Sequence, residues 1–132
     1  MSRFVLISAL AAVATFSSGA AAQDISVTLT EWKLRLSRDT VQAGSVTFEV
    51  TNRGTVDHSV QVVGPGVDKG TRQIGAREVA TLTVTLKPGS YEIYCPLAEG
   101  SHKTAGMSKT LVVIAGATPP AKPGATEQRR RD

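Results

Sequence analysis

The chain has 132 residues, of which 41% are hydrophobic and 20% are charged, and its formal net charge is +4 at pH 7. This length fits one domain and is short for two. The basic residues form no stripe with interleaved aromatic residues, which argues against a nucleic-acid-binding function.

Residues 1–22 have the pattern of a secretory signal peptide. Arg3 supplies a positive charge, residues 4–14 form an apolar segment, and Ala20–Ala22 provide a small-residue cleavage site. The apolar segment is well short of the roughly 20 residues that a membrane-spanning helix needs. We therefore expect cleavage after Ala22 rather than a membrane anchor, and export of the mature chain to the periplasm of a bacterium.

Export changes the charge balance of the protein. Without Arg3, the mature chain has 14 basic and 11 acidic residues, a net charge of +3. Residues 116–132 carry +2 of that charge and are rich in Pro, Ala, Gly and Arg, a composition that buries too little apolar surface to fold. We expect a near-neutral domain at residues 23–115, followed by a flexible tail at 116–132.

Apolar residues alternate with polar ones in the first half of this domain. Residues 25–36 predict two strands with a change of phase near Glu31. Residues 41–44 read as a turn because Gly44 supplies a permissive backbone. Residues 46–51 predict a further strand, which the polar and glycine residues at 52–54 bring to an end.

The second half of the domain also predicts short strands. Residues 58–63 form one, with His58 at its first inward position, and residues 64–75 read as a loop with four glycines. Residues 78–86, 90–95 and 111–114 complete the pattern, and no long segment has a helical period. About seven or eight strands with turns every 8 to 12 residues predict an all-β fold, a β-sandwich.

The side chains able to bind a soft metal are few. Apart from Met1, they are His58, Cys95, His102 and Met107. A single cysteine in an exported chain cannot form an internal disulfide, so it is either a metal ligand or a small buried hydrophobe. Two imidazoles, a thiolate and a weakly bound thioether are the ligands of a blue-copper site, so we predict one copper ion here.

Each of these four residues also has an ordinary interpretation. Taken singly, His58 would be a hydrogen-bonded core histidine, His102 a solvated loop residue and Met107 core filler. Strand ends and loops of a sandwich gather at one end of the fold, which would bring His58 to Cys95 and the loop that follows it. The joint placement of all four residues therefore favours a metal site.

The motifs around these residues resemble those of the cupredoxins, in particular the small secreted plastocyanin/azurin-like proteins. The resemblance covers about residues 24–115 and rests on these segments: Asn52-Arg53-Gly54 with His58, Tyr94-Cys95-Pro96, Gly100-Ser101-His102 and Ala105-Gly106-Met107. It implies a cupredoxin-like Greek-key β-sandwich that holds one type 1 copper ion. The equatorial ligands would be His58, Cys95 and His102, with Met107 as the axial ligand.

The resemblance also implies an electron exit at His102, surrounded by an apolar docking patch. Candidates for this patch are Leu97, Ala98, Gly64 and Pro65.

The chain departs from compact members of that family in two ways. Six residues separate Cys95 from His102, and Ser59 follows the first histidine where an asparagine is common. A longer loop would expose the copper or shift its potential. Asn52 is a candidate brace for the ligands, because outer hydrogen bonds orient them, and the alternative is an ordinary turn-forming asparagine.

Three functions remain open at this point. The first is a one-electron carrier that cycles between Cu(II) and Cu(I) with redox protein partners. The alternative is a Cu(I)-handling protein for delivery or resistance, and the third is a sandwich used only for adhesion or assembly. We rank the carrier first because dedicated Cu(I) carriers usually offer more Met or Cys, and we expect a monomer.

Enzymatic activity has little support in the sequence. Four protein ligands leave no open position for a substrate, unlike the metal of a catalytic site. Zinc is a less suitable occupant, because a thioether is an unusual fourth ligand for it. An acid pair among Glu31, Asp57 and Glu99 has nothing in the pattern to favour it.

Overall fold

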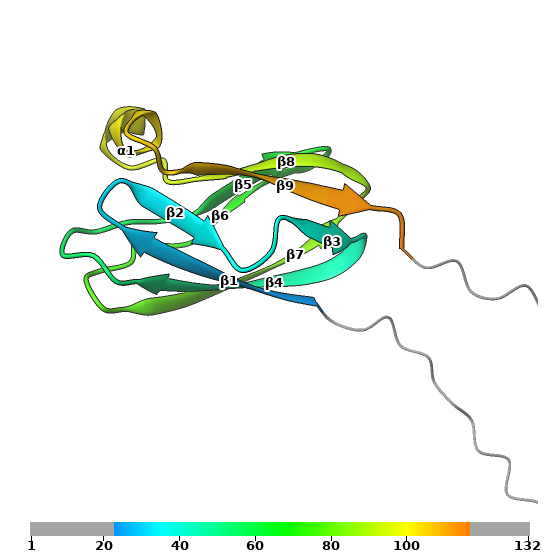
Figure 1. The fold of residues 1–132 in the computed structure, drawn as a ribbon, viewed down its shortest axis with the longest axis horizontal. Coiled ribbons are helices and arrows are strands. Elements are labelled where there is room, and N and C mark those ends of the chain that lie inside the picture. Colours follow the sequence, from blue (N-terminus) through cyan, green and yellow to red (C-terminus); the bar gives the residue numbers. More distant parts are fainter. Residues whose placement is uncertain (1–22, 117–132) are drawn as a thin grey trace, which may run out of the picture.

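The computed structural model describes residues 23–116, which form two facing β-sheets and one short helical segment (Figure 1). The elements are β1 (Gln23–Thr30), β2 (Lys33–Leu36), β3 (Thr40–Gln42), β4 (Gly44–Asn52), β5 (Gln61–Gly64), β6 (Val67–Gly70), β7 (Val79–Leu86), β8 (Gly89–Tyr94), the 3-10 turn η1 (Ala98–Gly100), α1 (Ser101–Thr104) and β9 (Ser108–Ile114). No helix among these residues is long and apolar enough to cross a membrane.

The strands are ordered β2-β1-β4-β7 in the first sheet and β3-β9-β8-β5-β6 in the second. The β1–β4 and β3–β9 pairs are parallel, and the other pairs are antiparallel. Neighbours in each sheet are thus often distant in sequence, as in Greek-key folds. The prediction of an all-β Greek-key sandwich is confirmed.

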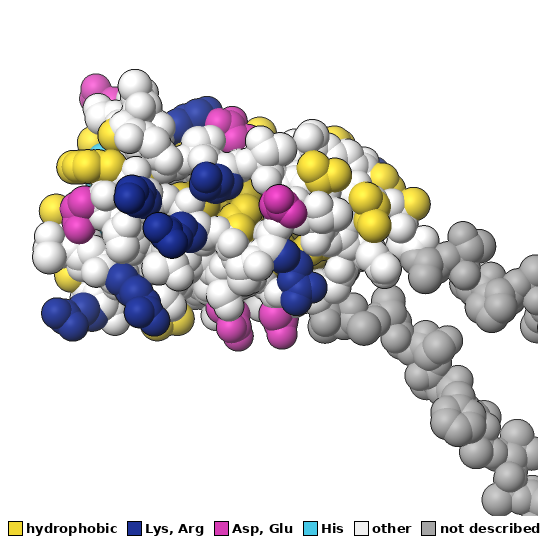
Figure 2. All heavy atoms as spheres, in the orientation of Figure 1, with side chains coloured by type: hydrophobic (Ala, Val, Ile, Leu, Met, Phe, Trp, Pro, Cys, Tyr) yellow, Lys and Arg dark blue, Asp and Glu magenta, His cyan; other side chains and the backbone are white. Residues whose placement is uncertain are grey.

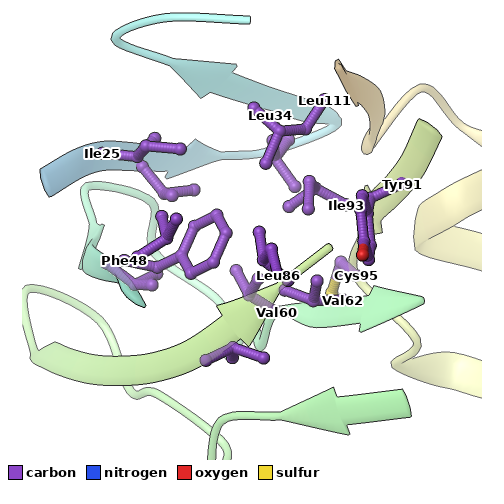
Figure 3. Packing of buried hydrophobic residues seen from close by; sticks show 14 of the residues in the cluster. Ile25, Leu34, Phe48, Val60, Val62, Leu86, Tyr91, Ile93, Cys95 and Leu111 are labelled. Carbon is purple, nitrogen blue, oxygen red and sulfur yellow. The ribbon is translucent and has the colours of Figure 1, made fainter. Parts of the chain in front are cut away.

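The core lies between the two sheets and follows from the period of two in the strands. Inward positions on β1, β4 and β8 are fully or almost fully buried; they are Ile25, Val27, Leu29, Val46, Phe48, Val50, Tyr91 and Ile93. Figure 3 shows these layers meeting, with Cys95 beside Val62 and Tyr91 at one side of the cluster. Each large apolar side chain buried here contributes about 1.5–3 kcal/mol to folding.

Two of the nine strands lie where the sequence predicted turns or loops. β3 occupies part of the predicted turn at 41–44 and pairs with β9. β6 lies inside the predicted loop at 64–75 and forms a hairpin with β5 through Gly66, whose φ is +69°. Both are edge strands of three or four residues, too short for alternation to be recognised, so the estimate of seven or eight strands was low.

The prediction of a strand at 58–63 was wrong at its beginning. β5 starts at Gln61, and His58 instead forms an isolated bridge with Ile74. The inward orientation was right, because His58, Val60 and Val62 are all fully buried. The bridge gives His58 two backbone hydrogen bonds without placing it inside a sheet.

The loops at one end of the sandwich hold the candidate site. At this end, which we call the site end, β1 turns into β2, β4 leads towards His58, and β8 leads into α1 (Figure 1, left). The described chain begins at Gln23 and finishes at Gly116 at the opposite end. The predicted signal peptide at 1–22 and the predicted tail beyond Gly116 lie outside the described residues.

Candidate metal centre

Three predicted ligands converge at the site end. His58 comes from the connection between β4 and β5, Cys95 directly follows β8, and His102 lies in α1. One potential ligand atom from each residue lies within 4.8 Å of the other two. Residues 37 or more positions apart in the sequence therefore meet in one cluster, as the distribution of scarce residues predicted.

Cys95 continues the inward alternation of β8, so its side chain is fully buried. Its Sγ lies 3.5 Å from Nδ1 of His102 and accepts a long hydrogen bond, also of 3.5 Å, from the backbone N–H of Ser59. The sulfur thus faces the segment of His58 and the ring of His102 at once.

His58 is fully buried, and neither ring nitrogen has a hydrogen-bond partner among the described residues. Burial and the nearby His102 lower the pKa of His58, which keeps the imidazole in the neutral form that coordinates metals. A buried polar group without a partner is costly. A metal bound to one of these nitrogens would satisfy it, so this residue fits a metal ligand better than a core histidine.

The loop from Cys95 to Met107 is coiled rather than extended. η1 and α1 take up the residues between them, and Ala98, Glu99 and Gly100 adopt left-handed backbone angles, with φ of 53°, 52° and 86°. This tight path returns His102 to Cys95, and His102 remains only partly exposed. The longer spacing between the two ligands therefore does not open the site widely.

Met107 is fully buried beside the cluster. Its carbonyl accepts a hydrogen bond of 3.0 Å from the Cys95 amide, and its own amide donates one of 3.1 Å to the backbone carbonyl of His102. The backbone thus holds this residue next to both Cys95 and His102. Its role as the axial ligand stays a prediction.

Asn52 ties the segment leading to His58 to the rest of the fold. Its buried Nδ2 donates to the carbonyls of Val56 and Ile74, and its Oδ1 accepts from the Gly54 amide. Ile74 is the bridge partner of His58. Asn52 therefore acts as a brace one step removed from the ligand, beyond the turn-forming role that its sequence context also allows.

No feature of the sequence pattern placed Glu31 and Trp32 at the site. They form the two-residue turn between β1 and β2, where Trp32 has a φ of 65°. Oε1 of Glu31 lies 3.6 Å from Nε2 of His58. The ring of Trp32 meets that of His102 edge-on, with centroids 5.0 Å apart. The predicted change of phase near Glu31 marked a turn, but not what the turn contacts.

Glu31 is held in a defined place by the backbone ahead of His58. Its Oε1 accepts hydrogen bonds from the amides of Thr55 and Val56, at 2.6 and 3.1 Å. These two bonds lower the pKa of Glu31, which keeps it ionised at neutral pH. A fixed negative charge therefore stands beside the buried imidazole.

Comparison with protein families decides the identity of the fold. Residues 3–107 match the model of the Cupredoxin-like domain, which is more than half of the chain. The chain belongs to the cupredoxin-like family. The match ends at Met107, the last of the four predicted ligands of this cupredoxin. No curated protein matches it significantly.

Solved structures of similar fold include three auracyanins. The dithionite-reduced auracyanin of Roseiflexus castenholzii has a TM-score of 0.60 and 21% identity, covering 73% of this chain and 99% of its own. Auracyanin B has a TM-score of 0.57 and 20% identity, covering 70% of this chain and 88% of its own. Auracyanin A of Chloroflexus aurantiacus, described as a "blue" copper protein, has a TM-score of 0.58 and 18% identity, covering 71% of this chain and 100% of its own.

The donor set of this cupredoxin fits copper. The cluster offers two imidazoles and one thiolate, and the partnerless nitrogens of buried His58 leave a position that a cation would satisfy. Family membership and this cluster together assign one type 1 copper ion to the chain as its cofactor. Among the described residues, no other group of three such side chains lies close enough to hold a metal.

Proposed function

We propose that this cupredoxin is a periplasmic one-electron carrier whose copper is bound by His58, Cys95 and His102, with Met107 as the axial ligand. The observation that carries the proposal is the buried convergence of two imidazoles and one thiol within 4.8 Å. When bound, copper supplies a Cu(II)/Cu(I) couple. The chain contributes the ligands, excludes water from His58, Cys95 and Met107, which are fully buried, and holds the ligands on braced loops.

The rival function is Cu(I) handling, which requires a site that exchanges its metal readily. Here His58 and Cys95 are fully buried, and only His102 is partly exposed. A site closed in this way suits retention of the metal through many redox cycles better than its delivery. Burial of the ligands therefore favours the carrier, and four protein ligands likewise argue against an enzyme.

Electron exchange would take place where His102 approaches the surface. Trp32 and Val56, exposed to 47% and 41%, lie on loops at the site end. In Figure 2, hydrophobic side chains gather beside a visible imidazole at that end. We therefore propose this apolar surface, with Leu97 and Ala98, as the contact for a redox protein partner.

Gly64 and Pro65 do not belong to that surface. Val63 pairs with Glu92, so Gly64 lies towards the beginning of β8, and a Cβ on Gly89 would lie 2.9 Å from Pro65. Both residues are thus at the end of the sandwich opposite Cys95. The sequence-based placement of these two residues was wrong, because register within the second sheet could not be read from composition.

The decisive experiment compares visible spectra of the copper-loaded wild type and of Cys95→Ser. We expect an intense thiolate-to-copper band in the oxidised wild type and its loss in the variant. A colourless Cu(II) adduct of the wild type would rule out a type 1 site. Rapid transfer of Cu(I) to a chelator without stable redox cycling would favour copper handling instead.

Export and oligomeric state need separate measurements. The proposed cleavage after Ala22 predicts a mature amino terminus at Gln23 in protein recovered from the periplasm. N-terminal sequencing of that fraction tests it, and intact protein in the cytoplasm would contradict it. Size-exclusion chromatography with light scattering tests the expected monomer.

A further inference from the structure

The turn between β1 and β2 contacts both imidazoles of the cluster. Glu31 lies beside His58, and Trp32 lies against His102. This turn belongs to the first sheet, whereas Cys95 and His102 lie on the connection between two strands of the second sheet. The turn therefore places a carboxylate next to one ligand from the other side of the sandwich.

The room for this carboxylate depends on Gly54. A Cβ at that position would lie 2.2 Å from Oε1 of Glu31, far closer than such atoms approach. The same oxygen accepts the amides of Thr55 and Val56. A glycine and two consecutive amides ahead of His58 thus form a fitted seat for a single carboxylate oxygen.

The orientation of His58 follows from this seat. Glu31 is the one carboxylate within 4 Å of either ring nitrogen of His58 in residues 23–116, and it faces Nε2 at 3.6 Å. Glu31 itself stands outside the three-residue donor cluster. Nδ1 is therefore the nitrogen left for the metal. A ligating histidine usually donates its other N–H to an outer acceptor, which fixes its tautomer and ring.

We propose that Glu31 is a positioning residue for His58: its carboxylate accepts the Nε2–H of the ligand and lowers the reduction potential of the copper. The inference rests on the proposed copper function. The separation of 3.6 Å is longer than the usual hydrogen-bond range of about 2.9–3.0 Å, so the bond requires Oε1 and Nε2 to approach each other by a fraction of an ångström. A fixed negative charge beside His58 stabilises Cu(II) more than Cu(I), because Cu(II) carries the larger charge.

A purely structural role for Glu31 makes a different prediction. Glutamine retains an amide oxygen that can accept the Thr55 and Val56 amides, so Glu31→Gln keeps the loop contacts and removes the charge. If Glu31 only connects two loops, the potential of Glu31→Gln stays at the wild-type value. Glu49→Gln is the matched control, because it removes the same charge from an exposed position on β4.

The test measures copper affinity in both oxidation states and the reduction potential of wild type, Glu31→Gln and Glu49→Gln. We expect Glu31→Gln to weaken Cu(II) binding about tenfold more than Cu(I) binding, because a neutral amide oxygen carries no charge and accepts the Nε2–H more weakly than a carboxylate does. That difference corresponds to a rise in potential of about 59 mV for one electron. A reduction potential of Glu31→Gln equal to that of Glu49→Gln would overturn the proposal.

Gly54→Ala provides an independent variant in which the charge is retained but displaced. The added Cβ would move the flexible end of Glu31 away from its seat without removing its charge. We expect the potential to rise in this variant too. An unchanged potential, with the site intact, would count against the proposal even if Glu31→Gln had folded poorly.

A second readout separates this inference from the proposed function. In Zn(II)-loaded protein, nitrogen-15 NMR should detect a His58 Nε2–H that exchanges slowly in the wild type and rapidly in Gly54→Ala, where the acceptor is displaced. Equal exchange rates would refute the role of Glu31. Absence of the thiolate-to-copper band in the wild type would instead refute the redox function, while the NMR result still decides whether Glu31 holds the ring.

Discussion

At the scale of single residues, one buried amide supports the whole approach to His58. Asn52 makes three hydrogen bonds across the segment that ends at the ligand, and one of them shares the Ile74 carbonyl with the His58 amide. No other side chain described here bonds to both Val56 and Ile74. The position of His58 thus depends on a residue that lies outside the three-residue cluster.

Replacing Asn52 by alanine should lower the free energy of unfolding by about 2–4 kcal/mol. The buried Gly54 amide would lose its partner at about 1–3 kcal/mol, and the partly buried Val56 carbonyl would lose its partner at a smaller cost because water can reach it. Urea denaturation of the metal-free protein measures this change in the free energy of unfolding. Asn52→Asp preserves size and the bond to Gly54 but not the donor, so wild-type stability in Asn52→Asp would show that the donated bonds are unimportant.

Glu78 predicts how stability depends on pH. Its hydrogen bond with the Arg72 guanidinium, and then the Gly75 amide, hold the pKa of Glu78 below its usual value of 4.5. A lowered pKa in the folded state means that the ionised form stabilises the fold above about pH 4.5. This contribution is lost as the pH falls through the folded-state pKa, where the carboxyl becomes protonated.

Urea midpoints of metal-free wild type and Glu78→Gln should therefore differ at pH 7 and converge in acid, once the pH has fallen through the lowered pKa of Glu78. Both side chains of the Arg72–Glu78 pair are more than half exposed, so solvent screens it and the difference will be small. A constant difference between wild type and Glu78→Gln at every pH would contradict the assignment.

At the scale of elements, the site depends on a close approach between two loops. Gly106, at the end of the loop that carries His102, has a φ of 128°, and a Cβ there would lie 2.9 Å from the Trp32 carbonyl. Gly100 has a φ of 86°, but nothing lies within 4 Å of its Cβ position. A substitution at Gly100 would therefore introduce backbone strain alone, whereas one at Gly106 would add a clash with the β1–β2 turn.

Gly106→Ala should be more destabilising than Gly100→Ala. Both variants place a side chain in a backbone conformation that costs about 1–3 kcal/mol, but only Gly106→Ala also pushes against the backbone of the β1–β2 turn. Trp32 is the only tryptophan in the chain, so its fluorescence emission reports movement of that turn. An emission shift equal in both variants would show that the contact does not restrain Trp32.

Comparison of the predicted and observed strands shows which elements a sequence pattern can identify. The alternation of Ile25, Val27 and Leu29 predicted β1 and its inward face correctly, because burial on one face of a sheet imposes a period of two. β3 and β6 were missed because three or four residues at a sheet edge carry too little pattern. His58 was placed on a strand although a single bridge to Ile74 holds it.

The sequence could predict only those site residues that belong to rare residue types and lie near strand ends. His58, Cys95 and His102 were singled out because these residue types are rare and fall near strand ends, and the structure brings the three together. Glu31 and Trp32 were not found, because glutamate is common and their contacts cross between sheets. Whether Met107 ligates copper stays a prediction.

At the scale of the whole molecule, the site and the ends of the described chain lie at opposite ends of the sandwich (Figure 1). The cluster joins a connection after β4 with the connection after β8, so a bound ion links segments 37 or more residues apart. Such a link acts on the native state alone, because the donors are brought together only by the complete fold. Metal binding and global stability are therefore coupled in this protein.

This coupling predicts that copper raises the temperature of unfolding. A ligand that binds only the native state adds about 4 kcal/mol when its free concentration is about 1,000 times its Kd. For a domain of this size, each 1 kcal/mol raises Tm by about 4–8 °C. Scanning calorimetry of wild type with and without copper measures the shift, and Cys95→Ser, which retains both imidazoles, should lose most of it. A wild type that melts at the same temperature with copper would mean that the convergence of His58, Cys95 and His102 does not bind the ion, and the sandwich would then serve only adhesion or assembly.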